Sequence, residues 1–354
     1  MGTKTKLFYH DKPLVGIDIS STGIKAMAIN QRKMTVLGYG SIDLDPQKVN
    51  NSLTAAKDDY LADGVRQLLR EKIHGKLPSN HVAISVPTSR TYSRTLELPL
   101  DAEANLSDSL QLEVEQYIPI AASELYIDHQ IVERNKENIT VLLTAVPKKI
   151  VDASVASCEK AGLQVVLVEP GISSAARLIR RTEEGHLPTI VIDVGAATSD
   201  IALVDQVVRV TGSAPVGGHT VTYTIADKLK VSFEEAHQLK VHSGLAPGPK
   251  QNQIRLALEP VLTQVAQETR KIMRYYAERL GAKTKIEQIL IVGGGSNLPG
   301  LGEFMTDAML MPSRVANPWH SISFGHLTPP SKLFKPRYIT AAGLGIIDPK
   351  EIWQ

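Results

Sequence analysis

One short stretch near the N-terminus decides the fold: Gly16-Ile17-Asp18-Ile19-Ser20-Ser21-Thr22-Gly23-Ile24-Lys25. An apolar run leads to Asp18, small polar residues follow it, and a second apolar run begins at Ile24. Apolar runs joined by Ser, Thr and Gly are typical of two strands connected by a tight turn. We therefore predict a β-hairpin whose first strand carries an acidic residue near its end.

The same unit recurs far along the chain, in Ile192-Asp193-Val194-Gly195-Ala196-Ala197-Thr198-Ser199-Asp200. When the two stretches are superposed, Asp18 aligns with Asp193 and Lys25 aligns with Asp200. A single long-range duplication of one strand–turn–strand unit indicates two lobes of related topology, because a solenoid needs more copies. The sequence thus predicts a duplicated α/β fold.

Paired turns of this kind suit a magnesium-bound triphosphate. Small residues let the backbone N–H groups approach phosphate oxygens, and two facing carboxylates can hold Mg²⁺ through its retained waters. The expected metal-binding residues are Asp18 and Asp193, and Lys25 adds a positive charge suited to phosphate. The expected phosphate-binding residues are Ser20, Ser21, Thr22 and Gly23, with Gly195, Ala196, Ala197 and Thr198. A single copy would be read as an ordinary β-turn; two copies in register disfavour that reading.

Three further segments are candidate site elements. The run Gly293-Gly294-Gly295-Ser296 follows a buried strand and can admit a nucleoside, although a ligand-free turn is the alternative. Gly217, Gly218 and His219 open a predicted helix and can present N–H groups to an anion, or they form a flexible helix start. Glu169, at a strand end before Pro170, can orient or deprotonate a water, or simply face solvent.

Composition excludes several classes of protein. The net charge is +2 with Lys and Arg dispersed among Asp and Glu, so we expect no nucleic-acid partner. The single cysteine, Cys158, permits no internal disulfide and is expected to be a buried apolar residue. We find no targeting segment in residues 1–12 and no apolar run of roughly 20 residues, so direct membrane insertion is not expected.

The hairpins and the glycine run together resemble the phosphate and adenosine motifs of the actin-like ATPase superfamily. Within it the chain is similar to the PilM family of type IV pilus assembly proteins, in three stretches: Arg94-Thr95-Leu96-Glu97-Leu98-Pro99, Glu113-Val114-Glu115-Gln116-Tyr117-Ile118-Pro119, and Leu143-Thr144-Ala145-Val146-Pro147-Lys148. The resemblance implies a two-lobed actin-like (ribonuclease H-like duplicated) fold with an inserted 1C subdomain. It implies binding of ATP and Mg²⁺, with weak or no hydrolysis, and places Glu235, Lys240 and Lys271 near ribose and adenine.

The resemblance also implies lobe boundaries and partners. We expect the first lobe (1A) over 1–80, 164–186 and 338–354, the 1C insert over 81–163, the second lobe (2A) over 187–230 and 285–337, and a helical subdomain (2B) over 231–284. The implied partner is the short N-terminal cytoplasmic tail of a PilN-like inner-membrane protein, alongside other pilus assembly proteins. The chain would then be cytoplasmic and peripheral at the inner face of the membrane.

Other assignments stay open at this point. A filament-forming FtsA- or MreB-like cytoskeletal ATPase shares the fold, and homo-oligomerisation is compatible with it. A sugar- or acetate-kinase-like phosphotransferase also shares it, although no acceptor-site motif is visible. Helical spacing of apolar residues further predicts helices over 53–72, 102–117 and 298–308.

Overall fold

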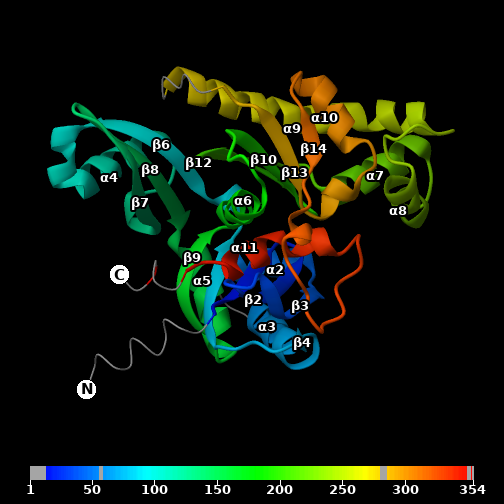
Figure 1. Cartoon of the computed structure of the whole chain (residues 1–354), viewed down its shortest axis with the longest axis horizontal. Helices are drawn as coiled ribbons and strands as arrows, with labels where there is room; N and C mark the ends of the chain where they lie inside the picture. Colours follow the sequence, from blue (N-terminus) through cyan, green and yellow to red (C-terminus); the bar gives the residue numbers. More distant parts are fainter. Residues whose placement is uncertain (1–12, 56–58, 280–284, 349–351, 353–354) are drawn as a thin grey trace. The chain divides into compact units, whose positions relative to one another are not determined.

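The structure is a computed structural model that describes residues 13–55, 59–279, 285–348 and 352. Residues 1–12, in which the sequence predicts no targeting segment, lie outside these ranges. Contacts between Cα atoms divide the chain into two compact units, coloured along the sequence in Figure 1. Unit 1 comprises Met1–Pro87, Lys149–Glu184 and Asn317–Gln354, and unit 2 comprises Thr88–Lys148 and Gly185–Ala316.

Unit 1 is built on a six-stranded sheet in the order β4-β3-β2-β1-β5-β9. Its first three strands pair antiparallel, whereas β5 and β9 continue the sheet in parallel. The strand bounds are β1 Val15–Ser20, β2 Gly23–Asn30, β3 Thr35–Asp43, β4 His74–Gly75, β5 His81–Val86 and β9 Gln164–Pro170.

Unit 2 is built on an eight-stranded sheet in the order β14-β13-β10-β11-β12-β6-β8-β7. Here β10, β11 and β12 pair antiparallel, and β13 and β14 continue from β10 in parallel. The strand bounds are β6 Tyr92–Pro99, β7 Leu125–Arg134, β8 Asn138–Pro147, β10 Thr189–Val194, β11 Ser199–Asp205, β12 Val207–Ala214, β13 Gln288–Val292 and β14 Ser313–Val315.

The two sheets share one topology. The order β3-β2-β1-β5-β9 in unit 1 matches β12-β11-β10-β13-β14 in unit 2, with the same mixture of antiparallel and parallel pairs. The duplicated two-lobed α/β fold predicted from the repeated hairpin is thereby confirmed.

Helices cover both sheets. The longest is α9, which buries Leu258, Leu262, Val265, Ile272 and Tyr276. The helix bounds are α2 Pro46–Ala55, α3 Tyr60–Glu71, α4 Leu106–Tyr117, α5 Lys148–Lys160, α6 Gly171–Thr182, α7 Gly218–Leu229, α8 Phe233–His242, α9 Gln251–Arg279, α10 Leu301–Met309 and α11 Ile339–Gly345. Within the described ranges, no helix combines the length and apolarity needed to cross a bilayer.

Three predicted helices differ in their bounds. The helix expected over 53–72 is two helices, α2 and α3, with residues 56–58 between them outside the described ranges. The helix expected over 102–117 begins with a 3₁₀ segment, Leu100–Asn105. The helix expected over 298–308 begins at Leu301, because Gly300 before it adopts a φ of 79°. These differences arise at element ends, where apolar spacing carries little information.

The segment between β5 and β9 has a small core of its own. Strands β6, β7 and β8 pack against α4 through Leu110, Val114, Ile139 and Val141. The first of these strands joins the larger sheet of unit 2 through a single pair, Val210 with Arg94. Strand β5 itself lies in the sheet of unit 1, so this compact segment begins after Pro87 rather than at residue 81.

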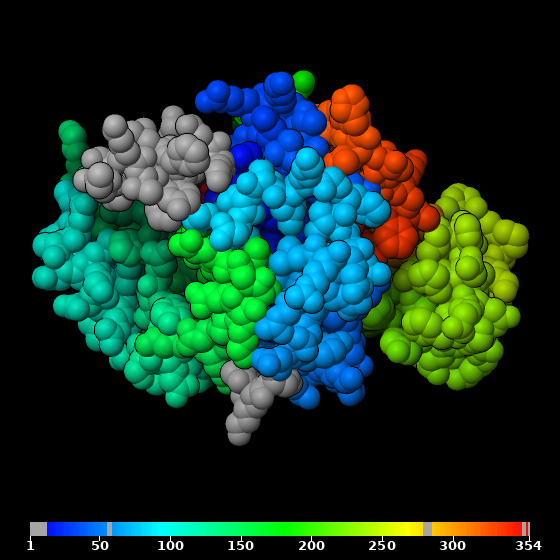
Figure 2. All heavy atoms as spheres, turned by 90° about the horizontal axis from the view of Figure 1, so that it is seen from below, coloured from blue at the N-terminus to red at the C-terminus, as the bar shows by residue number. Residues whose placement is uncertain are grey.

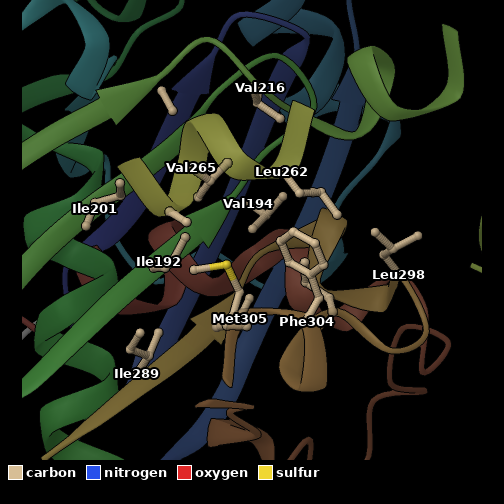
Figure 3. Close-up of a cluster of buried hydrophobic side chains, with 14 of the residues drawn as sticks. Ile192, Val194, Ile201, Val216, Leu262, Val265, Ile289, Leu298, Phe304 and Met305 are labelled. Atoms are coloured by element: carbon tan, nitrogen blue, oxygen red, sulfur yellow. The ribbon is translucent and has the colours of Figure 1, made fainter. Parts of the chain in front are cut away.

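The core of unit 2 supports the second hairpin. Ile192 and Val194 of β10 pack with Leu262 and Val265 of α9 and with Phe304 of α10 (Figure 3). Burial of such side chains stabilises a fold by roughly 1.5–3 kcal/mol each. The end of β10, where Asp193 lies, is therefore anchored by close packing on one side.

Candidate functional site

The first predicted hairpin forms as expected from the sequence. Strands β1 and β2 pair antiparallel with Ser20 opposite Gly23 and Asp18 opposite Lys25, so Ser21 and Thr22 form a two-residue turn. A side chain at Gly23 would place its Cβ 2.3 Å from the carbonyl oxygen of Ile42, so the close approach of β3 requires glycine here. None of the described residues accepts a hydrogen bond from the backbone N–H of Ser21 or Thr22.

A buried polar cluster holds the acidic side chain of this hairpin. The Nζ atom of Lys25 lies 3.1 Å from Oδ2 of Asp18 and donates to Oγ of Ser20 at 2.6 Å. The hydroxyl of Ser85, on β5, donates to Oδ1 of Asp18 at 2.8 Å and accepts the N–H of Ile19 at 3.1 Å. Each carboxylate oxygen of Asp18 accepts one such bond and retains a lone pair for a metal-bound water.

The second hairpin forms with the predicted register as well. Strands β10 and β11 pair with Asp193 opposite Asp200 and Val194 opposite Ser199. The N–H of Gly195 donates to the carbonyl oxygen of Thr198 at 2.8 Å, which closes the turn. The buried hydroxyl of Ser199 donates to Val216, and this bond ties the turn to the segment before α7.

This second turn leaves consecutive backbone donors without a protein partner. In the described part of the chain no acceptor receives the N–H of Ala196, Ala197 or Thr198, and all three residues are partly exposed. Successive N–H groups in a turn made of small residues form an anion-binding concavity. The turn is therefore chemically suited to phosphate oxygens.

The start of α7 plays a different part from the predicted one. The N–H of Gly218 donates to the carbonyl of Gly195 at 2.9 Å, and the N–H of His219 donates to the carbonyl of Ala196 at 2.9 Å. A Cβ on Gly217 would lie 2.4 Å from the oxygen of Ala196. The N–H groups of Gly218 and His219 therefore hydrogen-bond to the turn and fix the start of α7 against it, so they do not face a ligand.

Lys240 of α8 joins the same group. Its ammonium donates to the carbonyl oxygen of Gly218 at 3.0 Å and to the hydroxyl of Thr222 at 2.7 Å. Burial lowers the pKa of Lys240 below its usual value. An ammonium has three donors, so one remains for a ligand after these two bonds.

The glycine run after β13 packs directly on the second hairpin. A Cβ on Gly295 would lie 2.3 Å from Cγ1 of Val194, and Gly293 adopts a φ of 82° against Asp193. The hydroxyl of Ser296 donates to the carbonyl of Gly293 at 2.7 Å and closes a 3₁₀ turn, Gly294–Asn297. The structure therefore brings this run and the second turn together within unit 2.

Glu169 occupies an ion pair. Both its oxygens accept hydrogen bonds from the guanidinium of Arg177 at 2.6 Å, and the hydroxyl of Ser174 adds a third at 2.7 Å. Arg177 also reaches the carbonyl oxygen of Gly343, on α11, at 3.3 Å. This bidentate arrangement ties β9, α6 and α11 together.

Two other predicted residues are engaged on their own helices. Glu235 accepts the N–H of Ser232 at 2.9 Å in a capping box at the start of α8, and this backbone bond lowers the pKa of its carboxyl. Lys271 pairs with Glu268 at 2.8 Å on α9, and its side chain is 72% exposed. Glu268 lies beside Gly212 of β12, which is separated from β13 by two strands of the sheet.

Three contributing residues were missed by sequence reasoning. Ser85 and Arg177 hold Asp18 and Glu169, and Thr222 accepts from Lys240. A signal existed for Ser85, since it is a lone small hydroxyl in the otherwise apolar end of a buried strand, Ala83–Val86. No local pattern identifies Arg177 or Thr222, because their partners are fixed by packing.

Over the described ranges no three His, Cys, Asp or Glu side chains gather closely enough to hold an ion by themselves. Mg²⁺ usually keeps several waters and uses one or two carboxylates together with substrate phosphates. Asp18 and Asp193, each in the first strand of its own hairpin, have the carboxylate chemistry that this mode of binding requires.

Comparison with known protein families gives one match that covers most of the chain. A family model described as type IV pilus assembly protein PilM matches residues 16–347. The chain belongs to the PilM family. The family resemblance read from the hairpins and from the three stretches after Arg94 is thereby confirmed.

Solved structures agree with the fold of this PilM-family chain. A PilM–PilN type IV pilus biogenesis complex superposes with a TM-score of 0.78 at 20% identity, covering 95% of this chain and 99% of that one. MreB5 of Spiroplasma citri bound to AMPPNP superposes with a TM-score of 0.55 at 12% identity, covering 97% of each chain. At these identities the likeness shows the actin-like fold.

Sequence relatives extend to cell division proteins. FtsA of Borreliella burgdorferi is 25% identical over 205 residues, which are 52% of this chain and 48% of FtsA. The chain thus spans about half the length of that relative in the alignment.

Proposed function

We propose that this PilM-family chain is a nucleotide-dependent scaffold of type IV pilus assembly. In this proposal the two hairpin turns bind one ATP with Mg²⁺, and the scaffold binds the cytoplasmic N-terminal tail of a PilN-like inner-membrane protein. The chain is then peripheral at the inner face of the membrane and meets other pilus assembly proteins there. Family membership and the superposition on a PilM–PilN complex support it.

One observation carries the nucleotide part of the proposal. The turn after Asp193 presents the N–H groups of Ala196, Ala197 and Thr198, which no described acceptor receives. Unsatisfied backbone donors are costly unless water or a ligand meets them. In the proposal these N–H groups donate to the phosphate oxygens. The backbone N–H groups of Ser21 and Thr22, in the first hairpin, donate to phosphate oxygens in the same way.

The roles of the individual residues follow from their contacts. Asp18 and Asp193 hold the metal through its waters, and Lys240 uses its remaining N–H toward the nucleotide. The turn after Gly293 admits the nucleoside because its first two residues, Gly294 and Gly295, carry no side chain. Glu169 is already held by a guanidinium, which favours an anchoring role over proton abstraction and agrees with weak or absent hydrolysis.

The nucleotide-bound MreB5 structure supports the same reading by analogy of fold. A nucleotide can act as a switch only if it binds one conformation better than another. ATP therefore changes the affinity for the PilN-like tail only if the tail also prefers one conformation.

The direct test measures binding of a fluorescent peptide with the sequence of a PilN cytoplasmic tail, by anisotropy, with and without ATP and Mg²⁺. A scrambled peptide is the control. We expect specific binding of the tail peptide and a several-fold change when ATP is added. Binding that ATP leaves unchanged would reduce the proposal to a plain scaffold, and equal binding of the scrambled peptide would refute the partner assignment.

A further inference from the structure

A loop of unit 1, residues 321–337, exposes two large apolar side chains side by side in the sequence, and we call it the basic loop. Leu333 is 50% exposed and Phe334 is 51% exposed. The carbonyl oxygen of Ser331 accepts the N–H of Phe334 at 2.9 Å and the N–H of Lys335 at 3.0 Å, which closes a turn. We call residues 332–335, which form this turn and its end, the loop tip.

The base of the basic loop is held firmly along β3 (Figure 1). The hydroxyl of Tyr39 donates to the carbonyl oxygen of Thr328 at 2.6 Å, and the N–H of Val36 donates to the carbonyl oxygen of Ser323 at 2.8 Å. The ring of Phe324 packs edge-on against Tyr39, with the centroids 5.6 Å apart. Because its base is fixed, the loop presents its tip at a defined place on unit 1.

The sequence around the loop tip supplies cations and no carboxylate. Lys332 and Lys335 directly flank the two exposed apolar residues, and residues 308–347 contain no Asp or Glu. Asp43 of β3 reaches the loop, but it pairs there with Arg337. In the described part of the chain neither lysine of the tip forms an ion pair. The tip therefore combines apolar surface with unneutralised positive charge.

A second basic segment lies beside the basic loop. Residues 72–81 also contain no Asp or Glu, and Lys72 and Lys76 within them are exposed. A Cβ on Gly75 would lie 2.9 Å from a methyl carbon of Leu327, so the two segments touch; Figure 2 shows them as neighbouring sky-blue and orange-red atoms. Unit 1 thus has a local excess of positive charge, although the whole chain carries only +2.

This combination suits the surface of an anionic bilayer. Large apolar side chains enter the boundary between headgroups and acyl chains, while lysines are attracted to anionic lipids. A protein interface would instead surround its apolar core with a rim of directional hydrogen bonds. The side chains of the loop tip are two ammonium groups and two hydrocarbons, which a lipid surface satisfies without such geometry.

We propose that the basic loop binds the surface of an anionic lipid bilayer. Leu333 and Phe334 lie at the boundary between headgroups and acyl chains, and Lys332 and Lys335 lie among the lipid phosphates. The contact stays within the interfacial layer, which distinguishes it from insertion of a spanning segment. It requires neither nucleotide nor the PilN-like tail, so it adds a second attachment to the membrane beside the tail proposed above.

The contact is small and partly ionic, which sets its measurable behaviour. Two apolar side chains give reversible binding that depends on anionic lipid. Screening shortens the Debye length from about 10 Å at 0.1 M salt to about 3 Å at 1 M, so added salt should release the protein.

Co-sedimentation of the full chain with lipid vesicles tests the proposal, in the absence of ATP and of any tail peptide. One set of vesicles is phosphatidylcholine alone, and the other is equal parts phosphatidylcholine and phosphatidylglycerol. We expect binding to the anionic vesicles at low salt, several-fold weaker binding to phosphatidylcholine, and release in high salt. A wild type that binds neither kind of vesicle would overturn the proposal and favour an acidic protein as the occupant.

A charge variant tests the lysines of the tip. Lys332→Glu with Lys335→Glu should lower the affinity for anionic vesicles by at least about tenfold. The control is Lys136→Glu with Lys228→Glu, which makes the same change in net charge at exposed sites of unit 2 and should bind like the wild type. A circular-dichroism melt checks that each variant keeps the fold. Equal losses in the variant and the control would show a diffuse charge effect and overturn the assignment to this loop.

An apolar variant tests the hydrocarbon part of the contact. Leu333→Ser with Phe334→Ser leaves the charge unchanged and should still weaken binding several-fold. The control is Leu256→Ser with Leu310→Ser, because these side chains are 72% and 92% exposed in unit 2. Wild-type binding by the apolar variant would mean that the loop tip does not enter the bilayer.

A fluorescent label reports the depth of the tip directly. The variant Leu333→Cys can be labelled with an environment-sensitive dye, because the thiol of Cys158 is fully buried and does not compete. We expect a blue shift of the dye emission with anionic vesicles at low salt and none with phosphatidylcholine. A dye that stays in water while the protein sediments with anionic vesicles would overturn the proposal.

Discussion

The Oδ1 atom of Asp193 lies 2.0 Å from the position that a Cβ atom on Gly293 would occupy. The acidic end of β10 and the glycine run after β13 are therefore in direct contact, with no room for a side chain between them. This contact joins two motifs that the sequence presents as separate signals.

Gly293→Ala should disturb this contact. The new methyl group forces Asp193 to move, and the φ of 82° at this position adds backbone strain. We expect a loss of roughly 1–3 kcal/mol in the free energy of unfolding, measured by urea denaturation. Gly162→Ala is the matched control, because Gly162 has a φ of 86° with nothing within 4 Å of its Cβ position. Equal losses in the two variants would show that backbone strain alone matters.

Ser85→Ala should weaken the first hairpin. The change removes the donor to Oδ1 of Asp18 and the acceptor of the Ile19 N–H, both buried. Leaving such groups unpaired costs about 1–3 kcal/mol of unfolding free energy. Ser157→Ala, which removes only a bond to a helix carbonyl, serves as control. If both variants unfold at the same urea concentration, the cluster around Asp18 does not hold the hairpin.

Glu169→Gln separates an anchoring role from a catalytic one. Loss of the bidentate pair with Arg177 should lower the free energy of unfolding by about 1–3 kcal/mol, with ATP affinity nearly unchanged. Glu184→Gln, at an exposed position, should change neither quantity. Unchanged stability together with complete loss of ATP hydrolysis would instead identify Glu169 as a catalytic residue.

Cys158 should make stability depend on pH in the alkaline range. Burial raises the pKa of its thiol from 9.0 to about 12. The unfolded chain therefore loses the thiol proton first, and the folded state loses stability as pH rises from about 9 toward about 12. The free energies of unfolding of the wild type and Cys158→Ala, measured by urea denaturation, should converge as the pH rises, because the variant has no thiol to titrate. A difference in the free energy of unfolding that stays constant between about pH 9 and about pH 12 would contradict the raised pKa of the Cys158 thiol.

The local part of the fold was readable from the sequence because each hairpin is a continuous segment. Runs of apolar residues ending at Asp18 and Asp193 predicted both strands, both turns and the duplication, and the structure has all of them. The family resemblance rested on the same residues and is confirmed by the family model.

The remainder depends on contacts that sequence spacing does not encode. Ser85 reaches Asp18 from a strand that is 67 residues away, and Arg177 links Glu169 to a third element, α11. The N–H groups of Gly218 and His219 were expected to face a ligand, yet the fold uses them to clamp the second turn. Such outcomes follow from tertiary packing, which decides the partner of each donor.

Isothermal titration with ATP and Mg²⁺ tests the central claim most directly, on the wild type, Asp18→Asn and Asp193→Asn, with Asp101→Asn as an exposed control. We predict one ATP per wild-type chain, unchanged binding by the control, and a loss of at least about tenfold in affinity, near 1.4 kcal/mol, for each of the other two variants. Wild-type affinity in both Asp18→Asn and Asp193→Asn would contradict the account of two hairpins that share one metal-bound nucleotide.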